Sequence, residues 1–175
     1  MARISELRNA IKSGVSRQHR WRVTIDLPTY AGSSEDARSG SALARTANIP
    51  SYTMGVIELG YSGRILPVPG DRQFEEFTVN FLHVNDMKFR RALEKWSENV
   101  NGTTSNTGLS NLDDIMRDIT LELLDSNDQT TRTFVLKDAW PANMTSGDLD
   151  QNAMDSTIEY TVTFRYVELE TDVSR

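Results

Sequence analysis

The stretch GDRQFEEFTVNFLHVND, residues 70–86, holds the densest group of side chains that could do chemistry. It carries four acids, one arginine and one of only two histidines in the chain. Two carboxylates close together would suit general acid–base catalysis. Period-two alternation, however, places Phe77 and Phe81 on one face of a strand. Glu75 and Glu76 are neighbours at its start, so they point to opposite faces and cannot act as a pair. We interpret the stretch as an amphipathic strand with a charged entry.

No other residue pattern specifies a reaction. His19 and His83 have neither an HxH nor an HxxxH spacing, and the DSND stretch at 125–128 lacks the full ligand series of a calcium loop. Neither GxSxG nor GxxxxGK[ST] occurs. The sequence therefore predicts no catalytic, cofactor or metal site. A hydrolase built on Asp71 or Glu75 is a weak alternative, because no second carboxylate is spaced to pair with either.

Length and composition fit one soluble domain over 1–175, large enough for a core without staples. There is no cysteine, which excludes disulfides and thiolate metal sites. The net charge of -6 and the pI of about 5.0 are opposite to those of a protein that clamps nucleic acid. The N-terminus has no apolar run typical of a secretory signal, and no stretch is long enough for a membrane anchor.

Alternating apolar and polar residues predict most of the elements. The segments with this pattern are 20–27, 77–83, 118–125, 130–140 and 157–169. Residues 55–69 read as a further hairpin that turns at Gly63, with Pro67 and Pro69 demoting its second strand to an edge. One-sided patterning at this spacing predicts a mainly β fold, an antiparallel sandwich or barrel-like structure.

One flanking α-helix is expected over 86–98. Asp86 is a suitable N-cap, and Phe89, Leu93 and Trp96 fall on one helical stripe that would pack on a sheet. No other segment has so clear a helical period.

Two segments look suited to contacts with other molecules. Residues 1–14 form an N-terminal arm with a short amphipathic helix that is marginal alone. Residues 28–53 read as a long loop, small and polar, with apolar residues at its end. The candidate contact residues of these segments are Ile4, Leu7, Ile11, Ile49, Tyr52 and Met54. The pattern favours an interaction protein over an enzyme.

The order of these pieces resembles a known family. The residues that carry the resemblance are RWRVTIDLP, IELGYSGRILPVPGDR, FEEFTVNFLHVND, KFRRALEKWSENVN, DITLELLD, LKDAWPANM and STIEYTVTFRY. In this order and spacing they resemble the tail tube proteins of contractile-tailed, T-even-like bacteriophages, over about residues 15–168. The block of GDR, strand, ND and helix with its tryptophan carries most of the resemblance.

The resemblance implies a structural role in a virion that is assembled in the host cytoplasm. It implies hexameric rings whose sheets join edge to edge, and rings that stack into a tube through the arm and the 28–53 loop. The tape measure protein and then the DNA would pass through the tube without specific binding. The sheath would lie outside, and the baseplate and tail terminator at the ends. Which sheet face lines the channel is left open.

Other functions are compatible with the same residues. A tube initiator or terminator ring, or the tube of a phage-derived bacteriocin or secretion system, would share the fold. A monomeric sugar-binding β-sandwich, with Trp140 as a stacking ring, is a further alternative.

Overall fold

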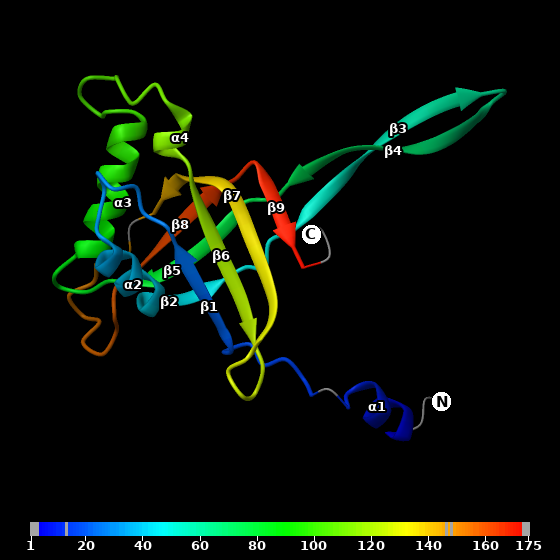
Figure 1. Cartoon of the computed structure of the whole chain (residues 1–175), viewed down its shortest axis with the longest axis horizontal. Helices are drawn as coiled ribbons and strands as arrows, with labels where there is room; N and C mark the ends of the chain where they lie inside the picture. The colour runs from blue at the N-terminus through cyan, green and yellow to red at the C-terminus, as the bar shows by residue number, and fades with distance from the viewer. Residues whose placement is uncertain (1–3, 13, 146, 148, 173–175) are drawn as a thin grey trace.

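The computed structural model describes residues 4–12, 14–145, 147 and 149–172. The protein is mostly β, with 42% of the described residues in strands and 20% in helices, which confirms the predicted antiparallel fold class. The strands are β1 (Trp21–Ile25), β2 (Ala44–Ala47), β3 (Tyr52–Tyr61), β4 (Arg64–Phe74), β5 (Phe77–Leu82), β6 (Arg117–Leu124), β7 (Thr130–Met144), β8 (Glu159–Arg165) and β9 (Glu168–Thr171). The helices are α1 (Ile4–Ala10), α2 (Ser34–Leu43), α3 (Lys88–Val100) and α4 (Leu112–Ile115). Figure 1 shows their arrangement.

The long strand β7 is shared by two sheets. Its first half pairs with β6 and β9, and its second half, from Trp140 onward, pairs with β8. Between the halves Asp138 takes φ 53°, a left-handed conformation that breaks the extended run. One sheet therefore has the order β1-β6-β7-β9, which we call the first sheet. The other has the order β2-β5-β8-β7, which we call the second sheet.

The core lies between the inner faces of these two sheets. In β5 the residues Phe77, Val79 and Phe81 are buried and alternate with half-buried polar ones, as predicted. The first sheet contributes Ile25 and Leu121 to the same apolar cluster. Burying such side chains stabilises the fold by roughly 1.5–3 kcal/mol each.

Helix α3 contributes one face to this core. Phe89, Leu93 and Trp96 are buried, as its stripe predicts, and the Trp96 indole N–H donates to the carbonyl oxygen of Ile115 at 2.7 Å. The helix begins two residues later than predicted, since Met87 takes φ 50° and only then does the chain become helical.

The prediction of an irregular loop over 28–53 is wrong. This segment contains α2 and β2. Helix α2 starts with a capping box, in which the Ser33 side chain accepts from the Asp36 backbone N–H while the Asp36 carboxylate accepts from the Ser33 backbone N–H. The backbone N–H and the hydroxyl of Ser33 both donate to the Asp36 carboxylate, and these two hydrogen bonds lower the pKa of Asp36. The predicted single flanking helix thus has a second helix packed beside it.

Two further boundaries differ from the prediction. The segment predicted as one strand over 157–169 contains β8 and the start of β9. After β8 the chain crosses to the first sheet, where the Val167 N–H donates to the carbonyl oxygen of Lys137. The hairpin expected at 55–69 extends over 52–74. The additional residues are at the base of the hairpin, outside the two apolar runs that indicate it in the sequence.

Contact between α2 and α3 allows a stability test at Gly40. A Cβ there would overlap the ring of Phe89, which is 1% exposed and lies 5.0 Å from the Phe81 ring between centroids. Alanine would normally stabilise a helix by about 1 kcal/mol over glycine. We expect Gly40→Ala instead to lower the free energy of unfolding by about 1–3 kcal/mol, because the ring cannot move aside.

Urea denaturation followed by circular dichroism would measure this difference. Gly60→Ala is the matched control, since a Cβ at Gly60 meets nothing within 4 Å. A Gly40→Ala protein as stable as the wild type would show that the α2–α3 packing is looser than described.

Candidate assembly surfaces

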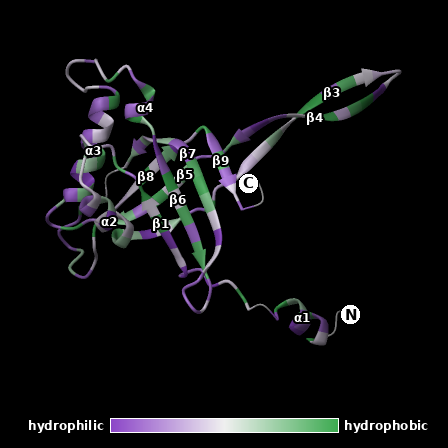
Figure 2. Ribbon diagram, viewed as in Figure 1, coloured by the Kyte–Doolittle hydropathy of each residue, from purple (hydrophilic) through white to green (hydrophobic). Residues whose placement is uncertain are grey.

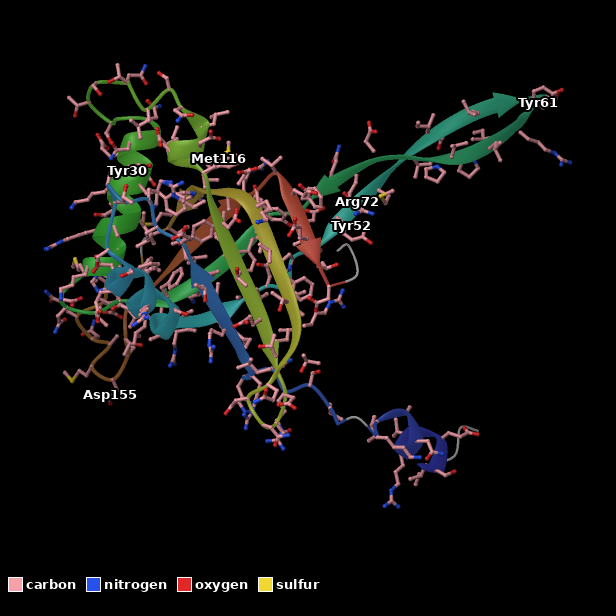
Figure 3. All side chains as sticks on the ribbon, viewed as in Figure 1. Tyr30, Tyr52, Tyr61, Arg72, Met116 and Asp155 are labelled. Atoms are coloured by element: carbon pink, nitrogen blue, oxygen red, sulfur yellow. The ribbon has the colours of Figure 1, made fainter. Side chains whose placement is uncertain are left out.

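The β3–β4 hairpin is an arm that extends away from the two sheets. Its strands are joined by Ser62 and Gly63, both with positive φ (50° and 79°), a combination that fits a tight two-residue turn. Figures 1 and 3 show the hairpin projecting from the body, with Tyr61 at its far tip. An isolated two-stranded hairpin is marginally stable in water at best. This arm therefore has the form of an element that is completed by a partner.

One face of the hairpin is apolar. The register pairs Ile57 with Val68 and Leu59 with Leu66, so these four side chains share a face, which we call the apolar ladder. Leu59 is 50% exposed and Leu66 is 60% exposed. Figure 2 shows hydrophobic residues along both strands of the arm. Contiguous exposed apolar surface of this kind marks a protein interaction site.

The root of the hairpin is fixed to the body. The carbonyl oxygen of Ser51 accepts from the Glu75 N–H at 3.0 Å and from the Tyr166 hydroxyl at 3.4 Å. The rings of Phe74 and Tyr166 lie 5.6 Å apart between centroids. Burial, with a smaller contribution from the Glu75 carboxylate, raises the pKa of Tyr166 to about 12. The arm is thus held at its base and free along its length.

The six residues singled out from the sequence lie on two separate surfaces. Ile4 and Leu7 are exposed on α1, and Ile11 follows in the next turn. Ile49 lies just before the hairpin, while Tyr52 and Met54 lie in β3 rather than in a loop. All six are exposed. Figure 1 shows the hairpin projecting at the upper right and α1 at the lower right, well apart from each other, so one chain does not bring the two groups together. Residues 1–3 and 13 of the N-terminal arm lie outside the described residues.

Sequence reasoning singled out none of the four residues of the apolar ladder as contact residues. Its signal was present, because apolar residues continue on both sides of the YSGR turn without a buried counterpart. Tyr52, which was identified, lies at the root, where the Arg72 guanidinium carbon is 4.3 Å from its ring centroid (Figure 3).

Two grooves flank the second sheet. The first is about 980 Å³ and lies among β1, α2 and β2, and we call it the basic groove because Arg22, Arg38 and Arg45 line it against one acid, Asp26. The second is about 510 Å³ and lies between α3 and residues 141–144 of β7. We call it the acidic groove, because Glu94 and Glu98 line it and no basic residue does. Neither groove was foreseen from the sequence.

Side chains that could do metal or acid–base chemistry are dispersed. Within the described ranges, no three His, Cys, Asp or Glu side chains are close enough together to hold a metal ion. The Asp125 carboxylate of the DSND turn accepts from the N–H groups of Asn127 and Gln129, which lowers its pKa and marks a structural turn. No helix among the described residues is long and apolar enough to cross a membrane.

Two buried tyrosines give an alkaline stability test. Burial raises the pKa of both Tyr160 and Tyr166 to about 12, from an ordinary value of 10.0. A raised folded-state pKa means that stability is full below pH 10 and is lost as pH rises toward 12. We expect the free energy of unfolding to fall by about 1 kcal/mol per tyrosine between pH 9 and pH 11.

Urea midpoints at the two pH values would measure this fall. The Y160F/Y166F double variant should lose clearly less stability over the same interval. An identical loss in the variant and the wild type would contradict the role given to these hydroxyl groups.

Comparison with known proteins identifies the family of the chain. Residues 16–171 match the family described as "Phage tail tube protein". A curated tail tube protein of Serratia phage KSP90 is 42% identical over 177 residues, with all of both chains covered. The anti-feeding prophage tube-terminating cap has a similar structure, with a TM-score of 0.65 and 16% identity over 90% of this chain and 91% of that one. The extended sheath–tube complex of the PVC extracellular contractile injection system has a TM-score of 0.61, at 15% identity over 98% and 99%. The two structures show a shared fold.

Proposed function

The chain belongs to the phage tail tube protein family, and from that premise we propose that it forms hexameric rings that stack into the inner tube of a contractile phage tail. A phage tail tube protein is a structural component of the virion. In our proposal the rings assemble in the host cytoplasm and the finished tube carries the genome out of the particle.

The observation that carries the self-assembly proposal is the exposed apolar ladder. Three of its side chains, Ile57, Leu59 and Leu66, are 50–60% exposed in the single chain, and burying each of these fully would gain on the order of 1 kcal/mol. In a tube every copy has identical neighbours, so every ladder can be covered. We propose that the ladder, the hairpin root residues Ile49, Tyr52 and Met54, and the N-terminal arm make the contacts between rings.

We propose that the outer face of the second sheet lines the channel. Thr78, Thr161 and Thr163 lie on this face, on the side away from the core and from the helices. The charges near it are paired, with Glu76 against Arg165 and Arg45 against Glu159. Small hydroxyl groups and paired charges on a protein of net charge -6 offer no cationic hold on DNA phosphates. The tape measure protein and DNA would slide past without specific binding.

This orientation determines where the remaining partners would make contact. The helix-bearing side would face outward, toward the sheath. The baseplate and the tail terminator would contact the two ends of the tube, where one surface of the last ring has no neighbouring ring.

Negative-stain electron microscopy of the purified chain at several concentrations, with and without the cognate baseplate, tests the proposed function. We expect hollow tubes. Rings that never stack would instead identify a tube initiator or terminator, and a monomer under all these conditions would contradict the proposal.

The apolar ladder can be tested by placing one charge on either face of the hairpin. Leu66 belongs to the ladder, whereas Ile65 pairs with Gly60 on the opposite face, and both are exposed. We expect Leu66→Glu to raise the protein concentration needed for tubes at least about ten-fold, the equivalent of 1.4 kcal/mol. Ile65→Glu is the matched control and should change it much less. Equal effects, read by sedimentation and microscopy, would show that the ladder has no special role.

Deleting residues 1–14 tests whether the N-terminal arm takes part in ring stacking. None of the described residues of α1 is buried, so the fold should survive the deletion. We expect the shortened chain to form rings and not tubes, because the arm's apolar residues would no longer bridge adjacent rings. Tubes of ordinary appearance in micrographs of this variant would rule out a stacking role for Ile4, Leu7 and Ile11.

A further inference from the structure

We propose that a pocket at the root of the β3–β4 hairpin binds a small phosphate monoester, a molecule that carries one phosphate group on an apolar stem. The pocket has a volume of about 390 Å³, and we call it the root pocket. Its lining comes from β3, β4, β7 and β9 and includes Tyr52, Arg72, Phe74, Arg132, Phe134 and Leu169. The pocket is formed within a single chain, so the inference does not depend on the formation of rings or tubes.

Two arginines supply the positive charge of the root pocket. Arg72 extends from β4 in the hairpin, and Arg132 extends from β7 in the first sheet. Among the described residues, no Asp or Glu lines the pocket and neither arginine forms an ion pair. The Asp172 carboxylate accepts from the Thr133 N–H at 3.1 Å and is not part of the lining. No carboxylate in the described part of the chain therefore neutralises the two guanidinium groups.

An aromatic ring positions each guanidinium. The Arg72 guanidinium carbon lies over the Tyr52 ring, 4.3 Å from its centroid, and Figure 3 shows these two residues side by side at the base of the hairpin. The Arg132 guanidinium carbon lies over the Phe134 ring at 4.9 Å, and this ring is 5% exposed. A contact with a ring uses none of the N–H groups that a guanidinium donates to an oxyanion. Both arginines are thus held in place and still able to donate.

The charge and the apolar lining of the root pocket together select the class of ligand. A phosphate monoester carries about -1.5 to -2 charges at pH 7, which matches two guanidinium groups, whereas a carboxylate carries one charge. Arginine also binds phosphate through two parallel hydrogen bonds. Phe74 and Leu169 are half-buried in the lining and would pack against the organic group. The volume lies within the range of small-ligand pockets, about 300–1,000 Å³.

The basic groove is less suited to the same ligand. It is larger, at about 980 Å³, but Asp26 is part of its lining. Arg22 and Arg45 each have a carboxylate at 3.7 Å in their own chain, from Glu122 and Glu159. These acids would repel a phosphate group that approached the two arginines, and in the described part of the chain the root pocket has no such acid in its lining.

A phosphate group bound by both arginines would connect the hairpin to the body. Among the described residues, β4 pairs only with β3, while β7 pairs with β6, β8 and β9. Arg72 therefore belongs to the projecting element and Arg132 to the fixed one. An anion that accepts from both offsets the repulsion between them and restrains the base of the hairpin.

Isothermal titration calorimetry with phenyl phosphate tests the root pocket in unassembled wild-type protein. At about pH 7.5, where the phosphate is mostly a dianion, we expect a Kd below about 1 mM. R72Q and R132Q should each weaken binding at least about ten-fold, because each removes one of two charged donors. R132K should also weaken it, since lysine keeps the charge and lacks the planar fork.

The matched control is R38Q, which removes an exposed arginine from the basic groove and should bind phenyl phosphate as the wild type does. Arg72 and Arg132 are both exposed, so their substitution leaves the core intact, and circular dichroism would verify this. Absence of binding to the wild type up to about 10 mM would overturn the proposal. Equal weakening in R38Q and R72Q would overturn it as well.

Two further arms identify the ligand and its source. Inorganic phosphate should bind at least about five-fold more weakly than phenyl phosphate, because it makes no contact with the apolar lining. Equal affinities would contradict the part assigned to Phe74 and Leu169. Assembled protein should bind phenyl phosphate as the single chain does. Binding that is lost on assembly would show that a side chain of another copy occupies the root pocket, and would overturn its assignment to a free phosphate ester.

Discussion

The bend of β7 at Asp138 is the constraint on which the rest of the structure depends. A single strand serves two sheets, and the left-handed backbone at this residue turns it from one to the other. The turn brings the two inner faces together around Phe81 and Leu121, with α3 against them. It also separates β7 from β6 after Ala139 and leaves residues 141–144 as an open edge. The bend that brings the two sheets together around the core thus also leaves a strand edge with which a second chain can pair.

Sequence reasoning recovered the elements that carry their own periodicity. Strands such as β1 and β6 have one buried face, and α3 has one apolar stripe, so alternation or a 3.6-residue period reveals them. Helix α2 has neither, because its residues are mostly small or polar. It is specified by the Ser33–Asp36 capping box and by the fit of Gly40 against Phe89, which depends on a distant segment. The break between β8 and β9 likewise arises from pairing with β7 across the sheets.

The candidate surfaces were predictable only in part. Exposed apolar residues in α1 and at the hairpin root stood out, because each interrupted a polar surrounding. The apolar ladder did not, since the register that places Leu59 opposite Leu66 is visible only in the paired strands. The two grooves join residues far apart in the chain, as Arg38 and Leu124 show in one of them. Their opposite charges are therefore a property of the folded protein, which no local pattern reports.

Hydrogen exchange in assembled and dissociated protein tests most directly the central claim that this chain is completed by copies of itself. Backbone amides of β2, of residues 142–144 and of the 52–74 hairpin would be followed by mass spectrometry. The account requires all three to become protected together on assembly, while amides of the buried strand β5 stay equally protected in both states. Assembled protein whose edge and hairpin amides exchange as fast as those of the single chain would contradict it.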